Sequence, residues 1–205
     1  MTNGSRRITQ YGTLPISNNV NVKFRPFTCR ISVQTLMQTL LDILTAIAED
    51  GVRKIVIWNS HGGNPDTIRA TLRAFSDTQP TDGGVFACLA SGPPGLGAKA
   101  GIVHPSVHGG ESETSEMLFE RPDLVHTDKF ENFPFGQIAV EALAGGAAHF
   151  VRPWHRAVPA SAGGQTSESS AEKGKILIEG SAEYLAELLV QLTEAPWSEA
   201  FPYKP

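Results

Sequence analysis

The hydrophobic positions in the first half of the chain change between helical and strand-like spacing. From Val33 to Asp50 apolar residues recur at three- and four-residue steps, which predicts a helix with Ser32 available as its cap. Lys54–Trp58 is a short β-branched run that indicates a strand covered on both faces, and Val85–Ala90 reads as another buried strand. Between them, an apolar stripe predicts a helix over Asp66–Asp77. This alternation with short loops predicts an α/β fold with right-handed crossovers.

The second half of the chain contains more loop-forming residues. Ser91–Gly101 is rich in glycine and proline, which predicts a surface loop of the kind that borders active sites. A short helix is expected to start near Thr114, and a last helix is expected over Ala171–Thr193, after a loop at Ala162–Gly174. Neither a repeat nor a second domain is recognisable, so we expect residues 1–205 to form one domain.

Charge and composition exclude several classes of protein. The 205 residues carry a formal net charge of −4, which gives no general attraction to nucleic acid or to an anionic membrane. No apolar stretch is long enough to span a bilayer, and the polar N-terminus has no secretory signal. Cys29 and Cys88 are expected to be buried free thiols, as in a reducing cytosol. We therefore expect a cytoplasmic protein that binds neither nucleic acid nor membrane.

A histidine and two glycines follow the first predicted strand, in the sequence NSHGGN at Asn59–Asn64. Ligands of open α/β sheets bind beyond the carboxyl ends of the strands, which is where His61 is expected. Gly62 and Gly63 allow a tight turn and the close approach of a ligand, and Asn64 can cap the next helix. The pattern leaves three roles open for His61: metal ligand, acid or base, or a hydrogen bond within the turn.

A second histidine precedes paired glycines in HGGESETSEML at His108–Leu118. Glu113 can be a capping-box or first-turn carboxylate, favoured by the helix dipole. Alternatively, His108 and Glu113 on one loop suit a hydrolytic metal site or a proton-transfer pair, and we expect His61 and His108 to meet at one rim of the sheet. A serine hydrolase, a P-loop protein and a dinucleotide-binding protein are excluded, because the chain has no G-x-S-x-G elbow and neither glycine fingerprint.

Three motifs occur in the order and spacing of the creatininase family, which this chain resembles. They are NSHGGN at Asn59–Asn64, HGGESETSEML at His108–Leu118 and SAEKG at Ser170–Gly174. The resemblance implies a three-layer α/β/α sandwich with a mostly parallel sheet, assembled as a homo-oligomer. It also implies two divalent metal ions (zinc, manganese or iron) and a metal-activated water. That water would hydrolyse an amide, formamide or lactam C–N bond of a small molecule.

The resemblance also implies roles for individual residues. His61 matches the metal-binding histidine of the family, and His108 matches the histidine thought to carry a proton to the leaving nitrogen. Glu113 matches the glutamate of the family's ETS motif and is expected near the site. Residues that we expect at the substrate are Trp58, Ser60, Gly62 and Trp154. For the two tryptophans a position in the core is an equal alternative.

The sequence departs from the family in its metal ligands. A Glu-x-His-Gly motif and a later Asp supply most ligands in the family, but no Glu precedes Glu49, no His precedes His61 and no Asp precedes Asp42. One histidine cannot hold a catalytic metal, because such sites use about three protein ligands. We therefore expect a domain that is N-terminally incomplete relative to the family. Gly63 stands where true creatininases carry Glu, which argues against creatinine as the substrate.

Three explanations for the missing ligands stay open. A separate chain can supply them, so that this polypeptide is one subunit of a split enzyme. The sequence can be a truncated or wrongly started product of a longer gene. The third alternative is a catalytically inactive creatininase-like subunit with a role in assembly or binding.

Overall fold

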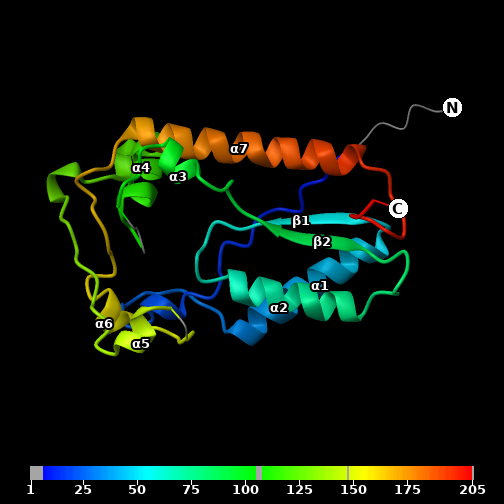
Figure 1. The fold of residues 1–205 in the computed structure, drawn as a ribbon, viewed down its shortest axis with the longest axis horizontal. Helices are drawn as coiled ribbons and strands as arrows, with labels where there is room; N and C mark the ends of the chain where they lie inside the picture. The colour runs from blue at the N-terminus through cyan, green and yellow to red at the C-terminus, as the bar shows by residue number, and fades with distance from the viewer. Residues whose placement is uncertain (1–6, 105–107, 147, 205) are drawn as a thin grey trace. The chain divides into compact units, whose positions relative to one another are not determined.

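The computed structural model describes residues 7–104, 108–146 and 148–204, and the chain divides into two compact units (Figure 1). The first unit comprises Met1–Val20, Cys29–Ser91 and Tyr184–Pro205, and the second comprises Asn21–Thr28 and Gly92–Glu183. The last helix, α7 (Ala171–Glu194), contributes residues to both units.

Helix α1 (Val33–Glu49) lies in the first unit and confirms the predicted helix to within one residue. Ser32 caps it as predicted, because its side-chain oxygen accepts a hydrogen bond from Thr35 N over 3.0 Å. Asp50 ends the helix, and Gly51 follows it with φ 84°, a conformation that glycine adopts at little cost. The buried side chains of this helix are Leu36, Leu40, Leu44 and Ile47.

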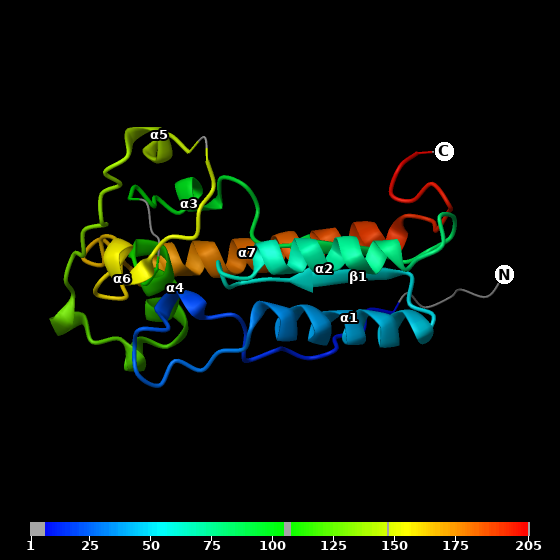
Figure 2. The ribbon, with the colours of Figure 1, turned by 90° about the horizontal axis from the view of Figure 1, so that it is seen from below.

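The two strands of the first unit, β1 (Lys54–Trp58) and β2 (Phe86–Ala90), form a parallel pair. Helix α2 (Pro65–Asp77) connects the two strands along the chain. The register of the strands pairs Trp58 with Ala90. Helices α1 and α2 lie side by side on one face of the strands (Figure 2). A core of Leu44, Ile47, Ile55 and Phe75 fills the space between the helices and the strands. The predicted alternation of helices and parallel strands is therefore confirmed.

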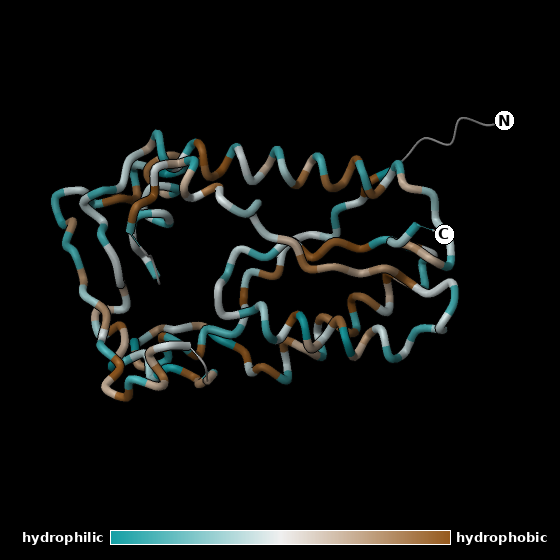
Figure 3. The backbone as a smooth tube through the Cα atoms, viewed as in Figure 1, coloured by the Kyte–Doolittle hydropathy of each residue, from teal (hydrophilic) through white to brown (hydrophobic). Residues whose placement is uncertain are grey.

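The strands are less covered than predicted. In the described part of the chain the sheet has two strands, which are hydrophobic along most of their length (Figure 3). In β1 only Ile55 is buried, and every residue of β2 is half-buried. The expectation of strands covered on both faces is therefore wrong, because in a sheet of two strands solvent reaches the side chains along the unpaired outer edge of each strand. The three-layer α/β/α sandwich with a mostly parallel sheet stays a prediction.

The cysteines are both free, as predicted, but they differ in exposure. Cys29 is exposed rather than buried, because it lies in the irregular segment that precedes α1. Cys88 is half-buried within β2, where desolvation raises the pKa of its thiol.

The second unit consists mainly of short helices joined by irregular segments. They are α3 (Leu96–Lys99), α4 (Glu111–Glu120), α5 (Glu141–Ala144) and α6 (Trp154–Ala157), with 3-10 turns at Pro122–Leu124 and Thr127–Lys129. The predicted loop Ser91–Gly101 is therefore wrong in part, because it contains α3. Helix α4 begins three residues before Thr114, since Glu111 and Glu113 are both stabilised in a first helical turn by the helix dipole.

The start of α7 packs directly on α4. A Cβ atom at Gly174 would collide with the backbone carbonyl of Ser115, so the two helices approach at backbone distance. Leu96, Ala100 and Leu177 form a small apolar cluster beside this contact. Although α7 has 24 residues, neither it nor any other helix in the described residues is long and apolar enough to cross a membrane.

Candidate functional site

The turn Asn59–Asn64 follows β1 directly and is held by the side chain of Asn59. The backbone N–H of Asn59 donates to Ala90 O over 2.9 Å and so continues the strand pairing. Its side-chain Nδ2 donates to His61 O over 3.0 Å, and its Oδ1 accepts from Asn64 Nδ2 over 3.2 Å. One asparagine therefore closes the whole turn and places His61 just beyond the carboxyl end of β1, as predicted.

Asn64 does not cap α2 with its side chain, contrary to the prediction. It occupies the cap position, but its backbone is helical (φ −92°, ψ −27°), and its side chain makes no capping hydrogen bond. A side-chain cap requires an extended backbone at this position, which the turn does not provide. The Asn64 Oδ1 atom is buried and has no hydrogen-bond partner among the described residues.

The imidazole of His61 lies against a backbone carbonyl, with Nε2 3.3 Å from Asn18 O. A Cβ atom at Gly63 would stand 2.7 Å from His61 Nε2 and 3.0 Å from Asn18 O. Only glycine leaves room for this arrangement, which explains the second glycine of the motif. Gly62 is exposed and has open space around the position of a Cβ atom.

His108 and Glu113 face each other at the start of α4. His108 Nδ1 lies 3.7 Å from Glu113 Oε2, and the two side chains are 39% and 52% exposed. The same Oε2 atom accepts a hydrogen bond from Gly109 N over 2.8 Å. The interpretation of Glu113 as a first-turn carboxylate is therefore confirmed, and this position also brings the carboxylate beside the imidazole. Its catalytic role stays a prediction.

Trp154 and Gly163 hold His108 from other directions. Gly163 N donates to His108 O over 2.8 Å, in an isolated antiparallel bridge. The Trp154 ring meets the imidazole edge to face, with centroids 5.9 Å apart and planes at 80°. The guanidinium carbon of Arg152 lies 5.7 Å from the Trp154 ring centroid. Trp154 is half-buried and therefore forms one wall beside the candidate acid–base residue.

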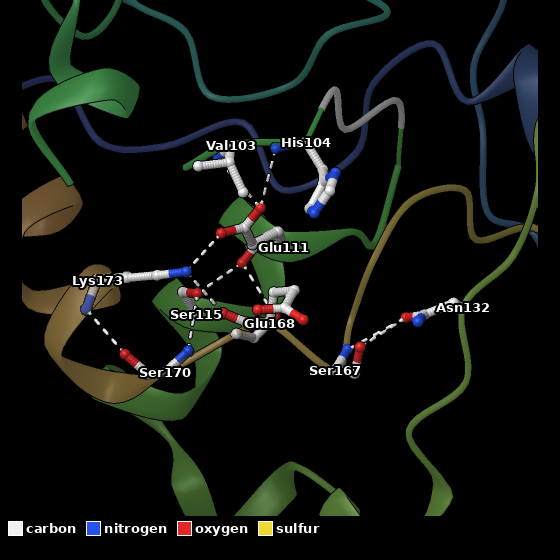
Figure 4. A network of polar contacts seen from close by, with 10 residues as sticks. Val103, His104, Glu111, Ser115, Asn132, Ser167, Glu168, Ser170 and Lys173 are labelled. Carbon is white, nitrogen blue, oxygen red and sulfur yellow. Dashed lines mark hydrogen bonds and ion pairs between the residues drawn. The ribbon is translucent and has the colours of Figure 1, made fainter. Parts of the chain in front are cut away.

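Glu111 is a residue of this region that sequence reasoning missed (Figure 4). Its side chain is fully buried, and Oε1 accepts from Lys173 Nζ over 2.6 Å. Oε2 accepts from the backbone N–H groups of Val103 (3.3 Å) and His104 (3.2 Å). Lys173 Nζ also donates to Glu168 O over 2.9 Å. A signal was present in the sequence, because the second and third motifs each contain one member of this ion pair.

Buried Glu111 and half-buried Glu116, both on α4, have opposite electrostatic environments. Desolvation raises the pKa of Glu111. The hydrogen bond and charge of Lys173, together with the amides of His104 and Val103, lower the pKa by more than desolvation raises it. The pKa of Glu111 therefore lies below its ordinary value. Desolvation and the charge of Glu113 raise the pKa of Glu116. Glu111 is consequently held as a carboxylate anion.

The candidate site residues fall into two groups. Trp58, Ser60, His61 and Gly62 belong to the first unit, and His108, Glu113 and Trp154 belong to the second. In the first group Trp58 is half-buried at the end of β1, and Ser60 is exposed in the turn. The meeting of the two histidines at one rim stays a prediction.

The described residues do not by themselves fit a metal centre. Within residues 7–104, 108–146 and 148–204, no group of three or more His, Cys, Asp or Glu side chains is placed to hold a metal ion. In this part of the chain the polar contact of the His61 ring is with the Asn18 carbonyl. A centre that includes His61 therefore requires ligands beyond those that the structure describes.

Comparison with known proteins gives a consistent result. The sequence model of the family named creatininase, described as creatinine amidohydrolase, matches residues 9–189. A candidate creatinine amidohydrolase from Bacteroides fragilis is 26% identical over 85% of this chain and 67% of its own, with a TM-score of 0.71. A creatininase variant of the Zn–Zn type is 22% identical over 83% of this chain and 68% of its own, with a TM-score of 0.63.

A manganese form of creatininase has the same identity and coverage as the zinc form, 22%, 83% and 68%, with a TM-score of 0.60. At this identity the two creatininases show a shared fold. None of the curated proteins matches the chain.

Proposed function

Because the chain belongs to the creatininase family, we propose that it forms part of a metal-dependent amidohydrolase. Its substrate class is a small amide, formamide or lactam whose C–N bond is hydrolysed. The observation that carries the proposal is the pairing of His108 with Glu113 beside Trp154. Cleavage of a C–N bond requires a proton for the leaving nitrogen, and an imidazole beside a carboxylate is suited to deliver it.

The geometry of the pair supports a separate task for each nitrogen of His108. Nδ1 faces Glu113, so Nε2 is the atom that exchanges a proton with the substrate. The distance of 3.7 Å is longer than a hydrogen bond, and we expect a small rotation to close it when the imidazole is charged. Trp154, whose ring contacts the imidazole, supplies an apolar wall for a planar amide.

His61 is the proposed metal ligand of this chain, and its turn provides a rigid support. Asn59 closes the turn, and Gly63 leaves space for the imidazole. The metal ions of the relatives, zinc and manganese, are the candidates here together with iron. When bound, such ions polarise a carbonyl and acidify water. The other metal ligands come from a segment outside this sequence, on a separate chain or on a longer product. Trp58, Ser60 and Gly62 contact the substrate near the turn.

Metal analysis of a completed assembly tests the proposal. The chain alone is expected to carry well under one equivalent of zinc, manganese or iron. Addition of a segment with the Glu-x-His and Asp ligands, fused or co-expressed, is expected to raise this to about two equivalents. The completed form is then assayed for amine or ammonia release from amides, formamides and lactams, where His108→Gln is expected to lower turnover by about 10²- to 10⁴-fold.

His61→Gln is expected to abolish most of the metal gain, whereas His126→Gln, a change of an exposed histidine outside both motifs, is the matched control. If the completed assembly gains no metal, or if both variants lose it equally, the enzyme proposal fails. A stable complex without metal would favour the alternative, an inactive subunit with an assembly role. A homo-oligomer is part of the proposal and is measured on the same sample by light scattering.

A further inference from the structure

The burial of Glu111 requires an explanation, because a carboxylate without water is unstable unless donors surround it. The side chain is 0% exposed, and that of Lys173 is 24% exposed. Both carboxylate oxygens have donors, one from Lys173 Nζ and the other from the backbone of Val103 and His104. The carboxylate thus joins three segments of the second unit: residues 103–104, the start of α4 and the start of α7.

The backbone of Glu111 strengthens the same junction. Its carbonyl accepts hydrogen bonds from Ser115 Oγ over 2.6 Å and from Ser169 Oγ over 3.1 Å. Ser115 Oγ in turn accepts from Ser170 N over 3.1 Å. Figure 4 shows that these groups converge between α4 and the segment leading into α7. The first turn of α4 is therefore fixed by polar contacts of side chain and backbone together.

The α4 part of this junction belongs to the same motif as the candidate acid–base pair. Glu111 is three residues after His108 and two before Glu113. Residues two positions apart on a helix point in different directions, so Glu111 points into the junction while Glu113 points outward to His108. Any rotation of the first turn of α4 would change the distance between Glu113 and the imidazole.

We propose that Glu111 and Lys173 are positioning residues, which fix the first turn of α4 so that Glu113 faces His108. The inference rests on the proposed function of that pair. It explains why a lysine of the third motif lies on a buried carboxylate of the second motif, 62 residues away, although neither side chain touches Glu113 in the described contacts. Glu113 acts on the imidazole directly, and Glu111 acts through Glu113.

Nitrogen NMR of the histidine rings tests this on the full chain, without metal or substrate. The ring signals of His108 are assigned by their loss in His108→Gln. Lys173→Met keeps an unbranched side chain as far as Cε and removes the charged amine, and it is expected to displace the His108 ring signals and to leave those of His126 in place. Glu111→Gln is expected to do the same.

Two controls separate positioning from a general loss of structure. Lys173→Arg retains the cation and its donors and is expected to restore the wild-type His108 signals. Glu120→Gln changes an exposed carboxylate at the last residue of the same helix and is expected to leave them in place. Unchanged His108 signals in folded Lys173→Met overturn the proposal, as does equal displacement by Lys173→Met and Lys173→Arg.

If Glu111→Gln does not fold, the two Lys173 variants still decide, because that side chain reaches solvent. The readout involves neither metal nor turnover. A negative result here therefore leaves the proposed hydrolase intact, and a negative metal analysis leaves the positioning pair intact.

Discussion

Lys173 Nζ donates a hydrogen bond to Glu111 Oε1 over 2.6 Å and thereby joins the second and third motifs of the sequence. The neighbouring residues of the SAEKG motif serve the same contact. Ser170 Oγ accepts from Lys173 N over 3.3 Å and stabilises the start of α7, and Gly174 allows the approach of Ser115. The third motif is therefore explained by the packing of α7 on α4, and its described contacts do not require a substrate.

The first prediction concerns the stability of this ion pair. Glu111→Gln leaves the ammonium of Lys173 in a mostly buried place without its counter-charge. Breaking a buried pair in this way costs about 3–5 kcal/mol, and the partial exposure of Lys173 places the expected loss near the lower limit. The free energy of unfolding, measured by denaturant titration of the full chain, provides the value.

The matched control is the exposed ion pair of Lys175 and Glu179 on α7, whose charged atoms are 3.9 Å apart and whose side chains are both more than half exposed. Glu179→Gln makes the same chemical change in water and is expected to cost less than about 1 kcal/mol. Equal losses for Glu111→Gln and Glu179→Gln would contradict the assignment of Glu111 as a buried partner.

The second prediction is the pH dependence of stability that Glu111 contributes. Its pKa in the folded chain lies below its ordinary value, since Lys173 and two amides outweigh the effect of burial. Between that pKa and the unfolded value of about 4.3, the unfolded state binds more protons, so the free energy of unfolding rises with pH. The stabilisation is complete above the unfolded pKa and is lost as the pH falls through the folded pKa.

Wild type is therefore expected to lose more stability than Glu111→Gln on acidification from about pH 6 to about pH 3. Glu116 gives a control of opposite sign, because burial and Glu113 raise its pKa. The folded state then binds the extra proton, so Glu116→Gln is expected to gain stability relative to wild type as the pH rises. Denaturant titrations across this range measure both differences, and the same sign for both variants would refute the interpretation.

Much of the first unit followed from the sequence because its signals are local. The periodicity of α1 and α2 and the short apolar runs of the strands predicted their bounds to within one or two residues. The cover of the strands could not be predicted in this way. An apolar run reports that a strand suits a buried position, whereas its burial depends on segments that pack from elsewhere in the chain.

The candidate site was only partly predictable for a related reason. Glycine and histidine motifs identified the turn of His61 and the pair of His108 with Glu113, since these contacts lie within a few residues. Glu111 and Lys173 were missed because an acid in a first helical turn has an ordinary explanation in the helix dipole, and a single lysine in a sequence usually lies in solvent. Their pairing requires knowledge of how α7 packs on α4.

The third prediction uses two glycines of α7 that differ in their surroundings. Gly174→Ala places a Cβ atom against the backbone of Ser115, which cannot move without shifting α4. Overpacking of this kind costs about 1–3 kcal/mol, even though alanine favours a helix by about 1 kcal/mol. Gly180→Ala meets the flexible end of Leu96 at 2.6 Å, so the side chain can yield, and a change within about 1 kcal/mol is expected. Thermal or denaturant unfolding distinguishes them, and equal losses would exclude the close contact.

The fourth prediction tests the space that Gly63 leaves for His61. Gly63→Ala puts a methyl group 2.7 Å from His61 Nε2 and 3.0 Å from Asn18 O, and the backbone oxygen is the less mobile of the two. The imidazole is therefore expected to rotate away from Asn18, which displaces its nitrogen signals in NMR. Gly62→Ala is the matched control, since a Cβ atom there meets open space and the signals should stay in place. Because both variants add one methyl group to the same turn, a displacement in Gly62→Ala alone would show that the turn differs from the one described.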